Sequence, residues 1–260
     1  MSLLSAFAAN PSLVLRHRNI FLLSHMRANT SLLGHLLGSH PQIEGYYEMH
    51  IGYYSWKSLW RQKMLHFADH SAKPGARYMF DKVLHDGHAV ALPLLERPSS
   101  RTILMLREPT QSIRSLVVLY REHLPTQPEA EVVGAARYYI DRLKSLAGVA
   151  RNLQSPYFYL DAELIVSDTA PTLAALGDWL QLDGPIPTEY GVFNRTGSGA
   201  AGDHSARLKS GKVAAQKRSY DEIEIPTALH EEALQAYGEH RAALIARAQR
   251  SVQLPTRAAA

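Results

Sequence analysis

The architecture of the chain follows from one segment, Asn19-Ile-Phe-Leu-Leu-Ser-His-Met-Arg-Ala-Asn-Thr-Ser-Leu-Leu-Gly-His-Leu-Leu-Gly38. Its first six residues form a short apolar run between polar neighbours, a pattern typical of a strand that is buried on both faces. From Thr30 onward the leucines recur at helical spacing on one stripe, and Gly38 ends this pattern. We therefore predict a strand over residues 19–24, a turn over residues 24–29 and a helix that begins at Thr30.

The same alternation of apolar runs and helical patterns recurs along the chain. Further strands are expected at residues 77–80, 102–106 and 157–160. Helices are expected at residues 86–96, 110–123, 128–153, 170–182 and 226–250. Strands that alternate with helices build a parallel sheet with helices on both faces. Because no repeat or clear linker divides the chain, we expect an α/β protein with a single domain over residues 1–260, with a core at about 19–213 and a C-terminal helix at about 226–250.

The composition excludes several classes of protein. The chain has 260 residues, of which 46% are hydrophobic, so it can bury a large core. It contains no cysteine, which excludes disulfide scaffolds, zinc fingers, iron–sulfur sites and thiol nucleophiles. The longest apolar runs are far shorter than the ~20 residues of a membrane-spanning helix, and residues 1–15 lack the regions of a signal peptide. We expect a soluble, cytoplasmic protein with no membrane span.

The positive charge is concentrated in two places. The whole chain has a net charge of +4, whereas residues 195–220 alone carry +5. No acidic residue precedes Glu44, although Arg16, Arg18 and Arg27 do. Two separate basic regions favour an anionic ligand that is bound at two points, such as a molecule with two phosphate groups. The alternative is a solvated basic loop without a ligand.

The predicted turn before the first helix has the chemistry of a phosphate site. Backbone N–H groups at a helix N-terminus attract anions, and Thr30 and Ser31 add hydroxyl donors while Arg27 adds a full charge. A helix cap without a ligand is the simpler interpretation of the same residues. The chain has no GxxxxGK[ST] motif, which disfavours a P-loop kinase because no lysine reaches the terminal phosphates of ATP.

A second basic group follows the predicted strand at residues 102–106. Arg107 stands at its carboxyl end, and Ser115 lies on the helix that follows. Ligands of open parallel sheets bind beyond the carboxyl ends of the strands, so Arg107 and Ser115 are expected to hold a second phosphate in the same crevice. The glycine-containing basic loop at residues 202–212 is the third element of this predicted site.

Taken together, these motifs resemble the sulfotransferases that use 3′-phosphoadenosine-5′-phosphosulfate (PAPS). The 5′-phosphosulfate loop of this family and the motif after it resemble residues 26–31 and Ser39-His-Pro41. Its 3′-phosphate motif resembles Arg107 and Ser115, and a later strand–helix segment of the family resembles residues 157–182. The loop at residues 202–213 is similar to the one that closes over the nucleotide. The resemblance spans about residues 20–213 and implies the three-layer, P-loop nucleoside-triphosphate-hydrolase-like sulfotransferase fold.

The resemblance also implies the ligand and the residues that bind it. The ligand is PAPS, with 3′-phosphoadenosine-5′-phosphate (PAP) as the product, and no metal is required. The residues implied to bind it are Arg27, Ala28, Asn29, Thr30, Ser31, Arg107, Ser115, Arg207, Lys209, Ser210, Gly211 and Lys212. Two positions depart from the family pattern: Asn29 replaces a glycine, although asparagine can also adopt a left-handed backbone, and Asp161-Ala162 replaces a Tyr-Glu pair.

Sulfuryl transfer needs a base for the acceptor hydroxyl and positive groups for the developing charge. Glu48 lies 21 residues after Arg27, the spacing of the catalytic glutamate in tyrosylprotein and carbohydrate sulfotransferases, so the resemblance implies Glu48 as the general base. His50 is the competing candidate, and His85 or His88 could also take this role. Arg27 and Lys82 are the implied charge-stabilising residues.

The acceptor is less well defined by the sequence. Residues 46–60 contain six tyrosines and tryptophans, which either bind a sugar or phenol or pack as a helix face at Tyr53, Trp56 and Trp60. We predict sulfuryl transfer to a hydroxyl of a glycan, a glycolipid or a small natural product, with no nucleic-acid partner. The competing hypotheses are a nucleic-acid-binding module that uses the basic loops and a P-loop kinase-like enzyme.

Overall fold

The computed structural model describes residues 11–197, 206–214 and 219–255. Within these residues one sheet contains six strands in the order β2-β3-β1-β4-β5-β6, and every neighbouring pair is parallel. The strands are β1 (Arg18–Ser24), β2 (Ile43–Glu44), β3 (Tyr78–Val83), β4 (Ser100–Leu106), β5 (Tyr157–Asp161) and β6 (Arg250–Val252). The predicted parallel α/β fold is therefore confirmed.

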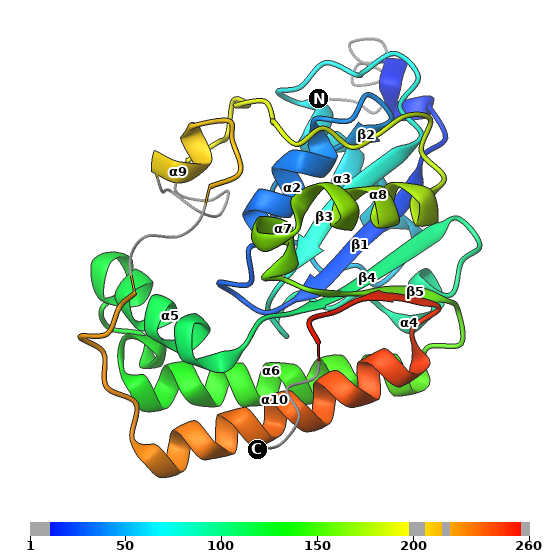
Figure 1. Ribbon diagram of the computed structural model, residues 1–260. Helices are drawn as coiled ribbons and strands as arrows, with labels where there is room; N and C mark the ends of the chain where they lie inside the picture. Colours follow the sequence, from blue (N-terminus) through cyan, green and yellow to red (C-terminus); the bar gives the residue numbers. More distant parts are fainter. Residues whose placement is uncertain (1–10, 198–205, 215–218, 256–260) are drawn as a thin grey trace.

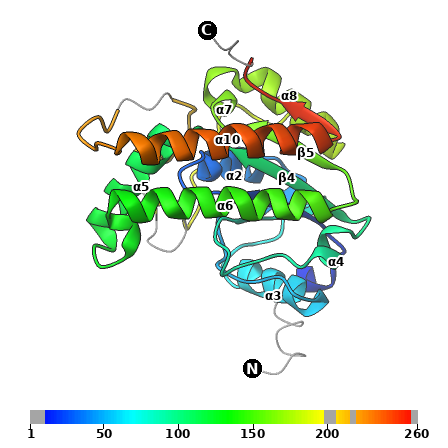
Figure 2. The same ribbon diagram turned by 90° about the horizontal axis from the view of Figure 1, so that it is seen from below.

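Helices cover both faces of this sheet (Figure 1). One face carries α2 (Thr30–Gly38), α7 (Leu164–Ser167) and α8 (Thr169–Leu180), and the other carries α5 (Pro109–His123), α6 (Val132–Asn152) and α10 (Thr227–Arg247). Figure 2 shows α6 and α10 side by side across the second face. The remaining elements are η1 (Pro11–Val14), α3 (Trp56–Phe67), α4 (Leu92–Leu95), η2 (Pro128–Ala130) and α9 (Ala206–Lys209).

The central strand β1 joins the two hydrophobic cores. Its residues alternate between the faces of the sheet, so Ile20 and Leu22 pack in the cluster that contains the leucines of α2. Phe21 and Leu23 pack in the opposite cluster, which contains Tyr139 of α6. Burial of each such side chain contributes roughly 1.5–3 kcal/mol. This double burial produces the three layers and makes β1 the strand from which the site is built.

Several predicted element boundaries were wrong, among them the start of the helix expected at residues 128–153, which begins at Val132, and the end of the strand expected at residues 77–80, which runs to Val83. The helix expected at residues 86–96 is only the short α4, because Pro93 lacks an N–H group and is accommodated in the first turn of a helix. The helix expected to run to residue 250 ends at Arg247, and Arg250 begins β6 on the edge of the sheet. The helix expected to reach residue 182 ends at Leu180, because Gln181 adopts a left-handed backbone.

A buried ion pair ties the C-terminal helix to the sheet. Arg241 of α10 donates to both carboxylate oxygens of Asp161 at the end of β5, with its shortest distance, 2.5 Å, from Nη2 to Oδ2. The backbone N–H of Leu254 also donates to Oδ2, at 2.7 Å. Asp161 is fully buried, so loss of Arg241 would leave a buried charge without its partner. The carboxylate therefore holds α10 and the segment after β6 against β5.

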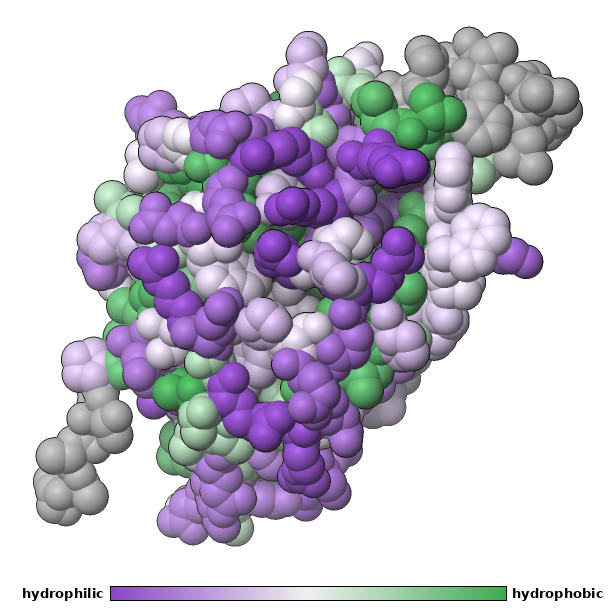
Figure 3. All heavy atoms as spheres, turned by 90° about the vertical axis from the view of Figure 1, so that its right-hand side faces the viewer, coloured by the Kyte–Doolittle hydropathy of each residue, from purple (hydrophilic) through white to green (hydrophobic). Residues whose placement is uncertain are grey.

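The surface away from the carboxyl ends of the strands is hydrophilic. Figure 3 shows the right-hand side of Figure 1, where hydrophilic residues dominate and apolar residues are scattered between them.

In the described parts of the chain, every helix is too short or too polar to cross a lipid bilayer.

Candidate active site

The loop between β1 and α2 has an unusual backbone. Arg27 and Asn29 both adopt positive φ angles, 65° and 56°, which are uncommon for residues other than glycine and often mark functional loops. Asn29 stands at the N-cap of α2, and its side-chain Nδ2 donates to the carbonyl of Ala162 at 3.0 Å. This conformation directs the first N–H groups of α2 toward the carboxyl edge of the sheet, where an anion is favoured.

The two predicted phosphate-binding groups contact each other directly. Arg27 Nε donates to Ser115 Oγ at 2.8 Å, and Arg107 Nη1 donates to the backbone carbonyl of Arg27 at 2.9 Å. Arg207 of α9 reaches the same place, and the three guanidinium groups line a small cavity of about 40 Å³ together with Thr30 and Ser31. The cavity has no acidic residue in its described lining, so it is a strongly positive site for anionic groups.

His25 connects the backbones of these two loops. Its Nε2 accepts a hydrogen bond from the backbone N–H of Arg107 at 3.0 Å, so the proton lies on Nδ1, which donates to the carbonyl of Met26 at 2.8 Å. The ring is buried and packs in a T-shaped arrangement with the Tyr139 ring. Burial lowers the pKa of the His25 imidazole to about 3. The neutral ring therefore acts as a fixed bridge between Met26 and Arg107.

This bridge predicts an acid-sensitive contribution to stability. The unfolded chain takes up a proton on His25 near pH 6.5, whereas the folded protein does so only near pH 3. The contribution of His25 to the free energy of unfolding is thus fully present above pH ~6.5. It falls by up to about 1.4 kcal/mol for each pH unit between pH ~6.5 and pH ~3. In His25→Gln the amide oxygen can still accept from Arg107 but cannot titrate, so we expect its stability to fall less steeply. Urea unfolding between pH 4.5 and 7 measures the difference.

The matched control for this prediction is Leu234→Gln, which adds an amide at an exposed position of α10 and removes no titratable group. Its stability profile should run parallel to that of the wild-type protein. If the profiles of His25→Gln and the wild type were also parallel, the bridge would not be neutral in the folded state.

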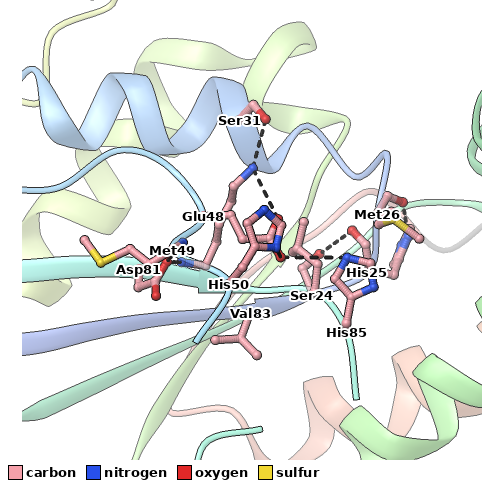
Figure 4. A network of polar contacts seen from close by, with 12 residues as sticks. Ser24, His25, Met26, Ser31, Glu48, Met49, His50, Asp81, Val83 and His85 are labelled. Atoms are coloured by element: carbon pink, nitrogen blue, oxygen red, sulfur yellow. Dashed lines mark hydrogen bonds and ion pairs between the residues drawn. The ribbon is translucent and has the colours of Figure 1, made fainter. Parts of the chain in front are cut away.

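A larger cavity of about 480 Å³ adjoins the positive site and contains Glu48. Glu48 is buried, with one oxygen 4.0 Å from Lys82 Nζ. Its other oxygen, Oε1, lies 3.6 Å from His50 Nδ1 and 3.8 Å from His85 Nε2. Figure 4 shows both imidazoles converging on this carboxylate. Within the described residues Oε1 accepts no hydrogen bond, so the cavity presents a buried carboxylate oxygen that lacks a donor.

Lys82 connects the two cavities. It lies on β3 and is almost completely buried, and its Nζ donates to Ser31 Oγ at 3.0 Å. Arg27, Thr30 and Ser31 line both cavities. The structure therefore brings Arg27, Ser31, Glu48 and Lys82 together at the carboxyl edge of β1 and β3.

Asp81 holds the loop that carries Glu48. Its Oδ1 accepts from the backbone N–H of Met49 at 3.1 Å, and its Oδ2 accepts from the Tyr53 hydroxyl at 2.5 Å. Burial raises the pKa of Asp81 to about 7. His50 then adopts a positive φ of 52°, which turns its ring toward the cavity. This support by Asp81 was not predicted from the sequence, although a charged residue within a buried strand is a visible signal.

The described basic residues of the late loop lie in different places. Of its described basic residues, Arg207 lines the small cavity, whereas Lys212 pairs with Glu189 at 3.2 Å on the surface and Lys209 is exposed. Ser210 donates to the carbonyl of Arg207 at 2.6 Å. Gly211 has a positive φ of 71°, and its carbonyl accepts from Tyr190. Residues 202–205 of the predicted loop lie outside the described residues.

Other predicted residues lie away from the two cavities. Ala28 is completely buried in the core beneath α2. The His88 ring lies 5.9 Å from that of His50, but His88 does not line the larger cavity. None of the six aromatic residues between positions 46 and 60 lines it either. Packing explains Tyr53, which is buried, but not Trp56, which is 58% exposed at the start of α3.

Among the residues that the structure describes, no three histidine or acidic side chains are arranged to hold a metal ion.

Comparisons with known proteins give the fold. No protein-family model and no curated protein matches the sequence. Among solved structures, the chain is similar to the sulfotransferase domain from the curacin biosynthetic pathway, with 17% identity, a TM-score of 0.61, and coverage of 86% of this chain and 97% of that one. It is also similar to the sulfotransferase domain from the Synechococcus PCC 7002 olefin synthase, with 18% identity, a TM-score of 0.54, and coverage of 92% and 97%. The chain therefore has the fold of these sulfotransferase domains.

Proposed function

We propose that the protein transfers a sulfuryl group from PAPS to the hydroxyl of an acceptor molecule. The observation that carries this proposal is the adjacency of two sites at one edge of the sheet. One is a positive site built from Arg27, Arg107 and Arg207, and the other is a cavity in which Glu48 and Lys82 meet. A shared fold with sulfotransferase domains supports the same assignment.

The donor groups of the positive site fit a nucleotide that carries phosphate groups on both the 3′ and the 5′ position of its ribose. Arg27, Ser31 and the N-terminus of α2 suit the 5′-phosphosulfate, because backbone N–H groups and a guanidinium favour an anion there. Arg107 and Ser115 suit the 3′-phosphate. When bound, PAPS supplies a sulfuryl group on a phosphate leaving group.

The residues of the adjacent cavity then have distinct tasks. Glu48 Oε1, which accepts no hydrogen bond within the described chain, takes the proton of the acceptor hydroxyl. The acceptor oxygen forms the new bond to sulfur as the bond between sulfur and the 5′-phosphate oxygen breaks. Lys82 and Arg27 stabilise the negative charge that develops on the departing phosphate. His50 and His85 flank the same carboxylate oxygen and orient it.

Nucleotide specificity tests this proposal. We expect PAP at 100 times its Kd to stabilise the protein by about 2.7 kcal/mol, which raises the Tm by roughly 5–10 °C in a domain of this size. AMP and ATP lack the 3′-phosphate and should raise the Tm much less at the same concentration. Thermal unfolding with each nucleotide measures the difference. Equal shifts with all three would contradict the proposal, and binding to a DNA oligonucleotide that weakens steeply with salt would favour the nucleic-acid hypothesis instead.

A further inference from the structure

The larger cavity has two chemically different walls. One wall carries the charged and imidazole groups around Glu48. The other is mainly apolar and comes from Met26 in the loop after β1, Leu84 after β3, and Leu119, Tyr120 and Leu124 on and after α5. His123, at the end of α5, is the polar residue of this wall. Leu124 is 52% exposed, so this apolar wall extends from the buried carboxylate to the solvent.

Apart from the groups assigned to PAPS and those around Glu48, the described lining offers few partners for the hydroxyls of a sugar, namely His123 and the hydroxyl of Tyr120. A sugar presents several hydroxyls, which need acceptor and donor side chains because a buried hydroxyl without a partner weakens binding. The described lining contains no asparagine, glutamine, aspartate or tryptophan, and its one carboxylate is Glu48. The aromatic-rich stretch between residues 46 and 60, which could have stacked on a sugar, faces elsewhere. The lining thus provides one polar end and a mainly hydrocarbon surface.

We propose that the acceptor is an apolar alcohol, with its hydroxyl at Glu48 and its hydrocarbon part along Met26, Leu84, Leu119 and Leu124. This inference rests on the proposed function and selects one class among its acceptors. A cavity of about 480 Å³ has the size of a small-molecule site with a few placed polar groups and a mainly apolar surface. A glycan acceptor would leave most of its hydroxyls against leucine side chains.

A homologous series of alcohols tests the inference. We expect the Kd of butan-1-ol, hexan-1-ol and octan-1-ol, titrated calorimetrically into the full-length protein with and without PAP, to fall about fourfold for each added methylene group. Methyl β-glucoside should not bind. A Kd that does not depend on chain length, or tighter binding of the glucoside than of octan-1-ol, would overturn the inference.

Two leucine variants assign the binding to this cavity. Leu119→Gln places an amide on the apolar wall at a half-buried position, and we expect it to raise the Kd of octan-1-ol at least fivefold. Leu234→Gln is the matched control, since Leu234 is exposed on α10 and does not line the cavity. Equal effects of the two variants would overturn the inference.

PAP binding, measured on the same samples, separates this inference from the proposed function. Failure to bind PAP would overturn the proposed function, whatever the alcohols do. Normal PAP binding together with a preference for the glucoside would overturn only the apolar acceptor.

Discussion

Replacing Glu48 with glutamine is expected to lower kcat by roughly a hundredfold to ten-thousandfold and to change PAP affinity less than twofold. The substitution keeps the size of the side chain but removes its ability to take a proton, and general base catalysis contributes typically 10²–10⁴-fold. PAP affinity should remain because Glu48 is linked to the residues assigned to the two phosphates only indirectly. The link is Lys82, whose Nζ lies 4.0 Å from Glu48 Oε2. PAP release from PAPS, with an alcohol on which the wild-type protein turns over, measures kcat, and calorimetry measures affinity.

The two neighbouring histidines provide the comparison for this prediction. His50→Gln and His85→Gln keep Glu48 in place and remove one imidazole each from its Oε1. We expect each variant to lose less than tenfold in kcat, because orientation of the base is weakened but the base itself remains. If Glu48→Gln kept a tenth or more of the activity while one histidine variant lost nearly all of it, that histidine would be the base.

The fold could be predicted because its signals are local. The run at residues 19–24 is apolar at every position between its ends, and this pattern distinguishes a strand buried on both faces from a surface strand. The helix after it begins at Thr30 and ends at Gly38, as expected from the sequence. β2 and β6 were missed because two or three residues are too few to show a period, and their positions depend on pairing with β3 and β5.

The positions of Arg27, Arg107 and Ser115 were also predictable in part. Residues that follow parallel strands gather at one edge of the sheet, so their proximity follows from topology once the strands are identified. Their mutual contacts follow the same logic. The roles assigned to these residues stay predictions, because proximity does not identify the ligand.

The supporting residues could not be predicted, because their contacts join distant positions without a periodic pattern. Tyr53 contacts Asp81 across 28 residues and His25 contacts Arg107 across 82. Charge composition likewise does not determine side-chain direction: in the late basic loop only Arg207 of the described residues lines the small cavity, while Lys212 pairs with a surface carboxylate. These contacts depend on packing, which a single sequence does not contain.

Arg107→Ala is expected to weaken PAP binding about a hundredfold while changing AMP binding less than threefold. The two nucleotides differ only in the 3′-phosphate, which the proposal assigns to Arg107 and Ser115. Loss of the charge-assisted hydrogen bonds from one guanidinium removes roughly 3 kcal/mol, equivalent to a factor of about 100 in Kd. Calorimetric titration of both nucleotides into the wild type and the variant measures the two ratios.

The AMP measurement is needed because Arg107 also has a structural contact. Its Nη1 donates to the carbonyl of Arg27 at 2.9 Å, so its removal can loosen the loop assigned to the 5′-phosphosulfate. That disturbance would weaken PAP and AMP binding equally, whereas loss of a 3′-phosphate contact weakens PAP binding alone. Arg101→Ala, at the opposite end of the same strand, should change neither affinity and is the control for loss of one positive charge. Equal weakening of both nucleotides by Arg107→Ala would move the 3′-phosphate away from Arg107, and Arg207, which lines the same cavity, would then be its strongest candidate.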